Sequence, residues 1–333
     1  MCSDCCCLYK DTMVESKRIK PRRLSRGDTI GIVSLASPVF KPSAIDEAIQ
    51  NLTRMGFRVK VSASVKKADR YLAGDDDFRL REFHRMVADP EVTAIMSTRG
   101  GYGSGRLLTR IDYELISKHP KIIIGYSDIT SILLAITRLT GLITFYGPMF
   151  ASEFKSPVSG FTADGFEKVL VQGELPLEIG PCPNAVDPLI LSPGRAQGAL
   201  VGGCLTLISY SLGTPYEIDT KGKLLFFEET REPPYKIDGM ITHLLNAGKL
   251  QECAGVAIGE MVDCDPDQRP GSFPSGSFHW EEVIEERLGG LGIPILAGLC
   301  FGHGEHKATL PVGGTACLDT ACRRLILTES PVC

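Results

Sequence analysis

The sequence lacks any long apolar segment. Its longest apolar runs, such as residues 121–124 and 132–136, are far shorter than the roughly 20 residues that a helix needs to cross a bilayer. Residues 1–17 also lack the apolar stretch that a secretory signal peptide requires. These two absences argue against a membrane-spanning protein and against a secreted one, and we expect a cytoplasmic protein.

The sequence also lacks an excess of positive charge. It has 36 lysines and arginines against 40 aspartates and glutamates, which gives a formal net charge of −4 and a pI near 5.9. The basic residues are scattered rather than gathered in stripes, so the electrostatic footprint of a nucleic-acid-binding protein is missing. We expect no nucleic-acid partner.

No paired C-x-x-C motif occurs beyond the first seven residues, although the chain contains 12 cysteines. In a cytoplasmic protein of this size we expect free thiols rather than disulfides. The four cysteines of the N-terminus allow three interpretations: a disordered tail without a role, reversible palmitoylation that would attach the chain to a membrane, or a metal site. Adjacent cysteines without a second half-site make a poor zinc site. These four are Cys2, Cys5, Cys6 and Cys7.

The chain has 333 residues, 43% of them hydrophobic, which predicts two globular domains with a substantial core. After a cysteine-rich tail at 1–18, strand-like and helical patterns alternate over residues 19–150, which is typical of a doubly wound parallel sheet. Strands are expected at 28–36, 57–61, 92–97 and 121–125, with helices at 43–55, 79–88 and 128–137. Ser43 is expected to cap the first helix and Gly56 to end it.

Residues 151–190 are rich in glycine and proline, and we expect a linker there. Residues 191–333 are predicted to form a smaller mixed β/α domain, and no internal repeat is visible. Within that domain strands are expected at 223–227, 255–259 and 293–299, and helices at 236–247 and 281–288.

The first motif with chemical potential places Ser127 at a turn between a strand and a helix. Such a turn projects a hydroxyl from the carboxyl edge of a sheet and points backbone N–H groups at the same space. The pattern departs from G-x-S-x-G because Ile129 stands where the second glycine belongs. An ordinary Ser-Asp helix cap is the alternative interpretation.

The second motif is the glycine-rich segment 98–105, which directly follows a predicted strand. Its glycine spacing does not match the G-x-G-x-x-G of a dinucleotide site, so we expect no nucleotide cofactor. A loop whose backbone closely approaches a ligand, with N–H groups available to an oxyanion, fits better. A glycine turn needed only for its positive φ remains the alternative.

The third motif places His303 between two glycines after an apolar strand. The nearby Glu305 and His306 raise the possibility of a metal site, but their spacing matches no zinc pattern, and we expect no metal. A serine hydroxyl needs a base and the base needs an acid. Glu228 and Glu229 end an apolar strand and are candidates for that acid, although a solvated strand end would look the same.

Taken together, these motifs resemble the L,D-carboxypeptidase family, serine peptidase family S66. The similarity extends from about Leu24 to Leu327, and several separate motifs occur in the family's order. They are R-L-S-R-G-D-T-I-G-I-V-S at 23–34, T-R-G-G-Y-G-S-G-R-L-L at 98–108, G-Y-S-D-I-T at 125–130, G-R-A-Q-G-A-L-V-G-G-C-L-T-L at 194–207, L-F-F-E-E-T-R-E-P-P-Y-K-I-D at 225–238 and F-G-H-G-E-H-K-A-T-L-P-V-G at 301–313.

The resemblance implies a Ser–His–Glu triad made of Ser127, His303 and Glu228. Glu229 then occupies the position that usually holds Asp in the family. It also implies an oxyanion hole formed by the N–H groups of Gly101 and Asp128.

The family fold that the resemblance implies is a class I glutamine-amidotransferase-like N-terminal domain with a smaller C-terminal domain, usually in a homodimer. For substrate binding we expect Arg99, through its fit to a terminal carboxylate, together with Gly100 and Tyr126. A structural ion pair is the alternative for Arg99.

The family has two known branches, and both act on small peptide-containing substrates. One removes the terminal D-alanine from murein tetrapeptides, and the other hydrolyses a peptide–nucleotide antibiotic and confers immunity. The motifs at 194–198 and 232–238 look closer to the first branch. A non-catalytic peptide-binding module on the same scaffold is a third possibility, which an intact triad disfavours.

Overall fold

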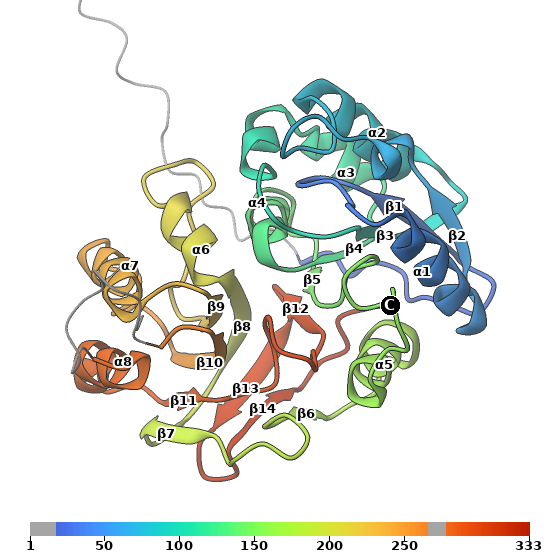
Figure 1. Ribbon diagram of the computed structural model, residues 1–333. Coiled ribbons are helices and arrows are strands. Elements are labelled where there is room, and N and C mark those ends of the chain that lie inside the picture. Colours follow the sequence, from blue (N-terminus) through green and yellow to red (C-terminus); the bar gives the residue numbers. More distant parts are fainter. Residues whose placement is uncertain (1–17, 266–277) are drawn as a thin grey trace, which may run out of the picture.

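The computed structural model describes residues 18–265 and 278–333, and the four N-terminal cysteines lie outside this range. The described chain forms two sheets that lie side by side, each accompanied by helices (Figure 1). The prediction of an α/β fold with an N-terminal parallel sheet and a second mixed β/α unit is confirmed.

The first sheet has six strands in the order β12-β5-β4-β3-β1-β2, and all neighbours are parallel except β12 and β5. The central strands are short apolar runs that are buried along their whole length, as expected for a parallel sheet covered on both faces. The strands are β1 (Thr29–Val33), β2 (Arg58–Val61), β3 (Val92–Ser97), β4 (Ile122–Gly125), β5 (Thr144–Tyr146) and β12 (Leu310–Val312).

Three helices of this half, α1 (Pro42–Arg54), α2 (Asp76–Ala88) and α4 (Thr130–Thr140), lie within a few residues of the predicted ranges. A further short helix, α3 (Tyr113–Lys118), was not predicted. The prediction that Ser43 caps α1 is wrong, because the helix already starts at Pro42, a residue whose fixed φ suits the first helical position. Gly56, with φ +87°, follows the helix end as predicted.

The second sheet has eight strands in the order β6-β14-β13-β8-β9-β10-β11-β7. Strands β8 to β11 are parallel to one another, and the flanking strands are antiparallel, which gives the predicted mixed character. The strands are β6 (Leu177–Ile179), β7 (Leu189–Ser192), β8 (Arg195–Cys204), β9 (Leu224–Thr230), β10 (Gly255–Val262), β11 (Ile295–Ala297), β13 (Thr315–Asp319) and β14 (Arg324–Leu327), with helices α6 (Leu205–Ser211), α7 (Pro234–Asn246) and α8 (Trp280–Leu288).

The glycine- and proline-rich segment 151–190 contains regular structure. It forms helix α5 (Gly160–Glu167), a π-helical turn at 168–172 and strand β6, and β7 begins before the segment ends. In the other direction, β12 comes from the C-terminal half of the chain but pairs with β5 of the first sheet. The two halves are therefore interleaved at this edge.

One prediction about the cysteines is wrong. Cys182 and Cys300 form a disulfide across 118 residues of sequence, with their Cα atoms 4.6 Å apart. Their partnership follows from the approach of residue 182 to the segment after β11, which nothing in the local sequence reveals. Six other described cysteines are free, as expected.

Within residues 18–265 and 278–333, no helix combines the length and apolar character needed to cross a membrane.

Candidate active site

Ser127 lies where β4 ends and a 3₁₀ turn (Ser127–Ile129) leads into α4. Its φ is +61°, a left-handed conformation that is uncommon for a residue with a side chain and typical of a strained strand-to-helix turn. Ile129 stands where the G-x-S-x-G pattern has its second glycine, and its side chain packs close to the first one. A Cβ on Gly125 would lie 2.9 Å from the Ile129 side chain. The glycine before the serine therefore makes room for the bulky residue after it.

The structure brings together the three residues that the sequence suggested as a triad. The His303 Nε2 atom lies 3.0 Å from the Ser127 Oγ atom, and the His303 Nδ1 atom lies 2.7 Å from Glu228 Oε2. Glu228 is completely buried, whereas the His303 side chain keeps 17% of its surface exposed. Ser127 follows the first sheet and Glu228 belongs to the second, so the site lies between the two sheets.

The loop that carries His303 passes directly over Glu228. Gly302 has φ +123°, and a Cβ there would lie 2.7 Å from Glu228 Oε2. A Cβ on Gly304 would lie 2.1 Å from the carboxylate of Glu260. Both glycines are needed because their backbone contacts carboxylates that a side chain would displace.

Glu228 and Glu229 have different surroundings. Glu228 pairs with His303, whereas Glu229 accepts hydrogen bonds from the backbone N–H and the hydroxyl of Thr206, both at 2.8 Å. Neighbouring residues of a strand point to opposite faces, which separates the two carboxylates. Burial raises the pKa of the Glu229 carboxyl above its usual value.

Tyr146 is a site residue that sequence reasoning missed. Its hydroxyl donates a hydrogen bond to Glu228 Oε1 at 2.6 Å, and the backbone N–H of Ser127 donates to the Tyr146 hydroxyl oxygen at 3.4 Å. The only signal in the sequence was a tyrosine at the end of an apolar run. A tyrosine buried there needs a hydrogen-bond partner for its hydroxyl, but the sequence does not show which residue that is.

The glycine-rich loop lies against the Ser127 side of the site. A Cβ on Gly100 would be 2.9 Å from Ser127 Oγ and 3.2 Å from the backbone nitrogen of Asp128. Gly101, the next residue, has φ +111° and contacts Ser37. The Asp128 side chain faces away from the serine and accepts the N–H of Ser104 at 2.8 Å, and burial raises its pKa. The two predicted oxyanion donors thus belong to segments that touch each other.

Arg99 and Tyr126 occupy different environments. Arg99 lies over the exposed ring of Phe40 at 5.1 Å and forms no ion pair with any residue of the described ranges. Tyr126 is buried, its hydroxyl donates to Glu153 at 3.0 Å, and its ring meets the His303 ring edge-on at 5.1 Å. Arg99 therefore has a guanidinium available to a ligand, whereas Tyr126 supports the histidine.

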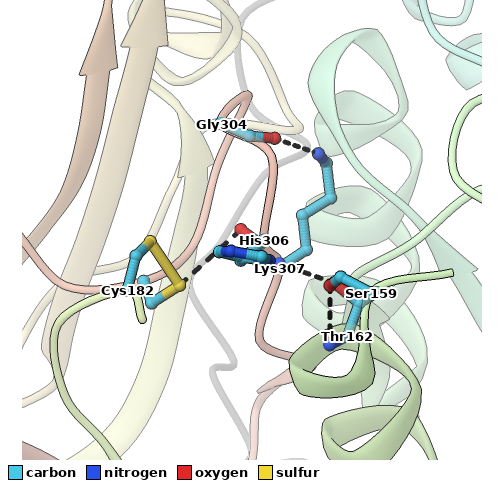
Figure 2. Close-up of a disulfide and its surroundings, with 7 residues drawn as sticks. Ser159, Thr162, Cys182, Gly304, His306 and Lys307 are labelled. Carbon is cyan, nitrogen blue, oxygen red and sulfur yellow. Dashed lines mark hydrogen bonds between the residues drawn. A yellow bond between two sulfur atoms is a disulfide. The ribbon is translucent and has the colours of Figure 1, made fainter. Parts of the chain in front are cut away.

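The residues after His303 are anchored on several sides, as Figure 2 shows. The buried ammonium of Lys307 donates to the Gly304 carbonyl at 2.5 Å and pairs with Glu153 at 3.2 Å. The Lys307 backbone N–H donates to Thr162 of α5 at 2.9 Å. The Cys182–Cys300 disulfide holds the start of this loop.

Two groups of side chains in the described chain have atoms close enough to share a cation. Cys182, Glu260 and Cys300 form the first, but its sulfurs are joined in the disulfide. Asp265, His279 and Glu281 form the second, which is largely exposed. Neither includes Ser127, His303 or Glu228.

Comparison with known proteins gives consistent matches. The LD-carboxypeptidase N-terminal domain matches residues 30–147, and the LD-carboxypeptidase C-terminal domain matches residues 197–318. A probable murein peptide carboxypeptidase of Bacillus subtilis is 39% identical over 317 residues, covering 94% of this chain and 96% of the relative.

Solved structures agree with these matches. A structure of MccF in complex with glutamyl sulfamoyl guanosine superposes with a TM-score of 0.84 at 27% identity, covering 94% of this chain and 99% of the other. A muramoyltetrapeptide carboxypeptidase from Oxalobacter formigenes gives a TM-score of 0.80 at 28% identity, covering 91% and 100%. The chain belongs to the LD-carboxypeptidase family.

Proposed function

We propose that this protein is a serine-type L,D-carboxypeptidase that releases a C-terminal D-amino acid, D-alanine, from a murein-type tetrapeptide. The observation that carries the proposal is the continuous chain from the Ser127 hydroxyl through His303 to the buried Glu228, with contacts of 3.0 Å and 2.7 Å. The names of the similar carboxypeptidases support the substrate class.

In the proposed mechanism His303 removes the proton from Ser127 as the hydroxyl attacks the scissile carbonyl. Glu228 holds the imidazole by Nδ1 and stabilises its positive form. The protonated histidine then gives its proton to the leaving amino group of the D-amino acid. Water hydrolyses the acyl-enzyme with His303 again acting as base.

The developing oxyanion would be bound by the N–H groups of Gly101 and Asp128. The closeness of Gly100 to Asp128 supports this assignment, since a Cβ on Gly100 would lie 3.2 Å from the Asp128 nitrogen. Removing one such donor typically lowers turnover about 10²–10³-fold. The short helix that follows Ser127 adds further N–H groups on the same side.

A second candidate function is hydrolysis of a peptide–nucleotide compound. The TM-score of 0.84 to MccF in complex with glutamyl sulfamoyl guanosine favours it. A purely binding role is disfavoured, because a binding module needs no hydrogen-bonded serine, histidine and carboxylate.

Mass spectrometry separates these functions. We expect the protein to convert a murein tetrapeptide to the tripeptide and D-alanine, and to leave an aminoacyl sulfamoyl nucleotide intact. Cleavage of the nucleotide compound alone would transfer the assignment to the second function. Binding of the tetrapeptide without cleavage of either compound would identify a binding module.

Arg99 is proposed to bind the terminal carboxylate of the substrate. Its guanidinium has no carboxylate partner in the described ranges. Arg99 itself lies two residues after β3, the strand next to β4, which leads to Ser127. We expect Arg99→Ala to raise KM about tenfold or more, the typical cost of a charge-assisted hydrogen bond, with a smaller change in kcat. Steady-state kinetics would measure this, with Arg85→Ala on α2 as a matched surface control. An unchanged KM would remove Arg99 from the site.

Gly100→Ala is expected to impair the enzyme sterically. The new methyl group would lie 2.9 Å from Ser127 Oγ, so either the serine or the loop must move. A displacement of that order can lower the rate about a hundredfold. Gly105→Ala is the control, because its methyl group would approach only Ser131 Oγ, at 3.9 Å. Equal kcat/KM values for the two variants would show that Gly100 does not border the reacting hydroxyl.

We also propose a cytoplasmic homodimer, as the family resemblance implies. Analytical ultracentrifugation of the purified chain tests the dimer, and fractionation of the producing cells tests the compartment. Whether Cys2, Cys5, Cys6 and Cys7 are acylated can be read from the intact mass of the native protein.

A further inference from the structure

Glu228 is a carboxylate with no exposed surface. Burial of an ionised carboxylate is costly unless hydrogen bonds replace the lost water. Its Oε2 atom faces His303, and its Oε1 atom receives the Tyr146 hydroxyl at 2.6 Å. The Tyr146 hydroxyl is therefore the hydrogen-bond donor to Oε1, the carboxylate oxygen that His303 does not contact.

Tyr146 is held in place by its surroundings. It ends β5 beside Gly125 of β4, and only 1% of its surface is exposed. Its ring meets Phe226 edge-on at 5.6 Å and Tyr126 at 6.1 Å. Burial raises the pKa of the Tyr146 hydroxyl well above its usual value, so it remains a proton donor at physiological pH.

The Tyr146 hydroxyl also connects the two halves of the site. It comes from the first sheet, and its acceptor Glu228 comes from the second. The backbone N–H of Ser127, the residue with the left-handed φ, donates to the Tyr146 hydroxyl oxygen at 3.4 Å. One hydroxyl thus contacts both the residue that carries the nucleophile and the acid of the proposed triad.

We propose that Tyr146 is a positioning residue that stabilises the Glu228 carboxylate and keeps it turned toward His303. This inference rests on the proposed function. By donating to Oε1, Tyr146 stabilises the charged carboxylate and leaves Oε2 for the imidazole. It does not touch the substrate, so its effect reaches the reaction only through Glu228 and His303.

Removal of the hydroxyl has an effect of known sign. A hydrogen bond donated to a carboxylate favours its charged form. Without it the charged carboxylate loses a stabilising donor, so the acid limb of the activity profile should move to higher pH.

Other titratable groups near Glu228 remain in place when the hydroxyl is removed. They are Tyr126, Cys204, Glu229, Glu260, Cys264 and His303. Burial raises the pKa of Glu260 to about 7, so this carboxyl also titrates in the assay range. Its contribution is common to wild type and variant, and the difference between the two profiles isolates Tyr146.

The test is Tyr146→Phe in the full chain, which removes one oxygen and keeps the ring. The first readout is the rate at which a fluorophosphonate labels Ser127 between pH 5 and 9, and the second is D-alanine release from the tetrapeptide. We expect labelling and kcat to fall about tenfold to a hundredfold, the cost of a hydrogen bond to a charged group. KM should change less than about twofold, because a variant raises KM when it removes an interaction with the bound substrate, and Tyr146 makes none. The acid midpoint should move upward.

Tyr113→Phe is the matched control, since it removes a hydroxyl that donates to the Leu108 carbonyl and not to a residue of the proposed triad. It should lose stability without a shift of the acid midpoint. In a Glu228→Gln background, Tyr146→Phe should change the labelling rate less than about twofold, because the carboxylate charge that the Tyr146 hydroxyl stabilises is absent. An unchanged midpoint in folded Tyr146→Phe, or an equal loss in both backgrounds, would overturn the inference.

If Tyr146→Phe does not fold, 3-fluorotyrosine at position 146 provides the reverse test. Its more acidic hydroxyl is a stronger donor, so the acid midpoint should move downward, and an unmoved midpoint would overturn the inference. Labelling without D-alanine release in the wild type would reject the proposed substrate and leave the Tyr146 test intact.

Discussion

Replacement of Ser127 by alanine is expected to abolish release of D-alanine from the tetrapeptide. Loss of a serine nucleophile from a Ser–His–acid triad lowers kcat by about 10⁶-fold in a well-studied protease, and the hydrogen-bonded geometry here supports a loss of similar size. The tetrapeptide should still bind, because Arg99 and the glycine loop are unchanged. Mass spectrometry would quantify turnover, and calorimetry would measure binding.

Ser131→Ala is the matched control for this experiment. Ser131 lies one turn further along, in α4, and is partly buried like the nucleophile. It should retain turnover close to wild type and label normally with a fluorophosphonate. Comparable D-alanine release by Ser127→Ala would show that another group attacks the substrate, and the proposed triad would then be wrong.

Glu228→Gln is expected to have the second-largest effect, lowering kcat by about 10⁴-fold. An amide in place of the carboxylate keeps the shape but favours the wrong histidine tautomer and gives no charge to stabilise the imidazolium. The short 2.7 Å contact to His303 Nδ1 and the complete burial of Glu228 support a loss of this order. Steady-state kinetics at the pH optimum would measure it, and KM should change little.

Glu229→Gln tests whether the effect is specific to Glu228, since it removes the other carboxylate at the end of β9. Glu229 bonds to Thr206 and not to the histidine, so its replacement should lower kcat less than about tenfold. Its main effect should be on thermal stability, through the hydrogen bonds to Thr206. Equal losses of kcat in the two variants would mean that both carboxylates support catalysis.

The sequence was informative about the first sheet for a physical reason. Parallel strands buried on both faces appear as continuous apolar runs, and β3 and β4 lie at or within one residue of the predicted bounds. Residues 151–190 were harder, because helix α5 contains two glycines and lacks a long apolar periodicity. Strand β12 has only three residues, and its partner β5 lies far away in sequence, so no local pattern reveals the pair.

The same reasoning explains which parts of the site were predicted. Ser127 follows an apolar strand and a glycine at a strand-to-helix turn, and His303 lies between two glycines; both local patterns mark a backbone that approaches other groups. For Glu228 the sequence offered two adjacent acids. Strand alternation implies that only one can face the histidine, but which one depends on how β9 sits in its sheet.

Tyr146 and the disulfide could not be predicted from local sequence. The Tyr146–Glu228 bond joins the two sheets across 82 residues, and Cys182 and Cys300 are separated by 118. Such pairs depend on how distant segments come together, and a single sequence carries no record of that. The family resemblance supplied the triad assignment but gave no indication of either pair.

The division of the proposed triad between two sheets has a consequence for protein synthesis. The ribosome completes the segment with Ser127 more than 100 residues before it reaches Glu228, and His303 emerges later still. Domains generally fold in the order of synthesis. A nascent chain that has folded only strands β1 to β5 therefore displays Ser127 without the histidine that the proposed mechanism assigns as its base. In the proposed mechanism, hydrolysis can begin only after the segment that carries His303 has docked beside Ser127 and Glu228.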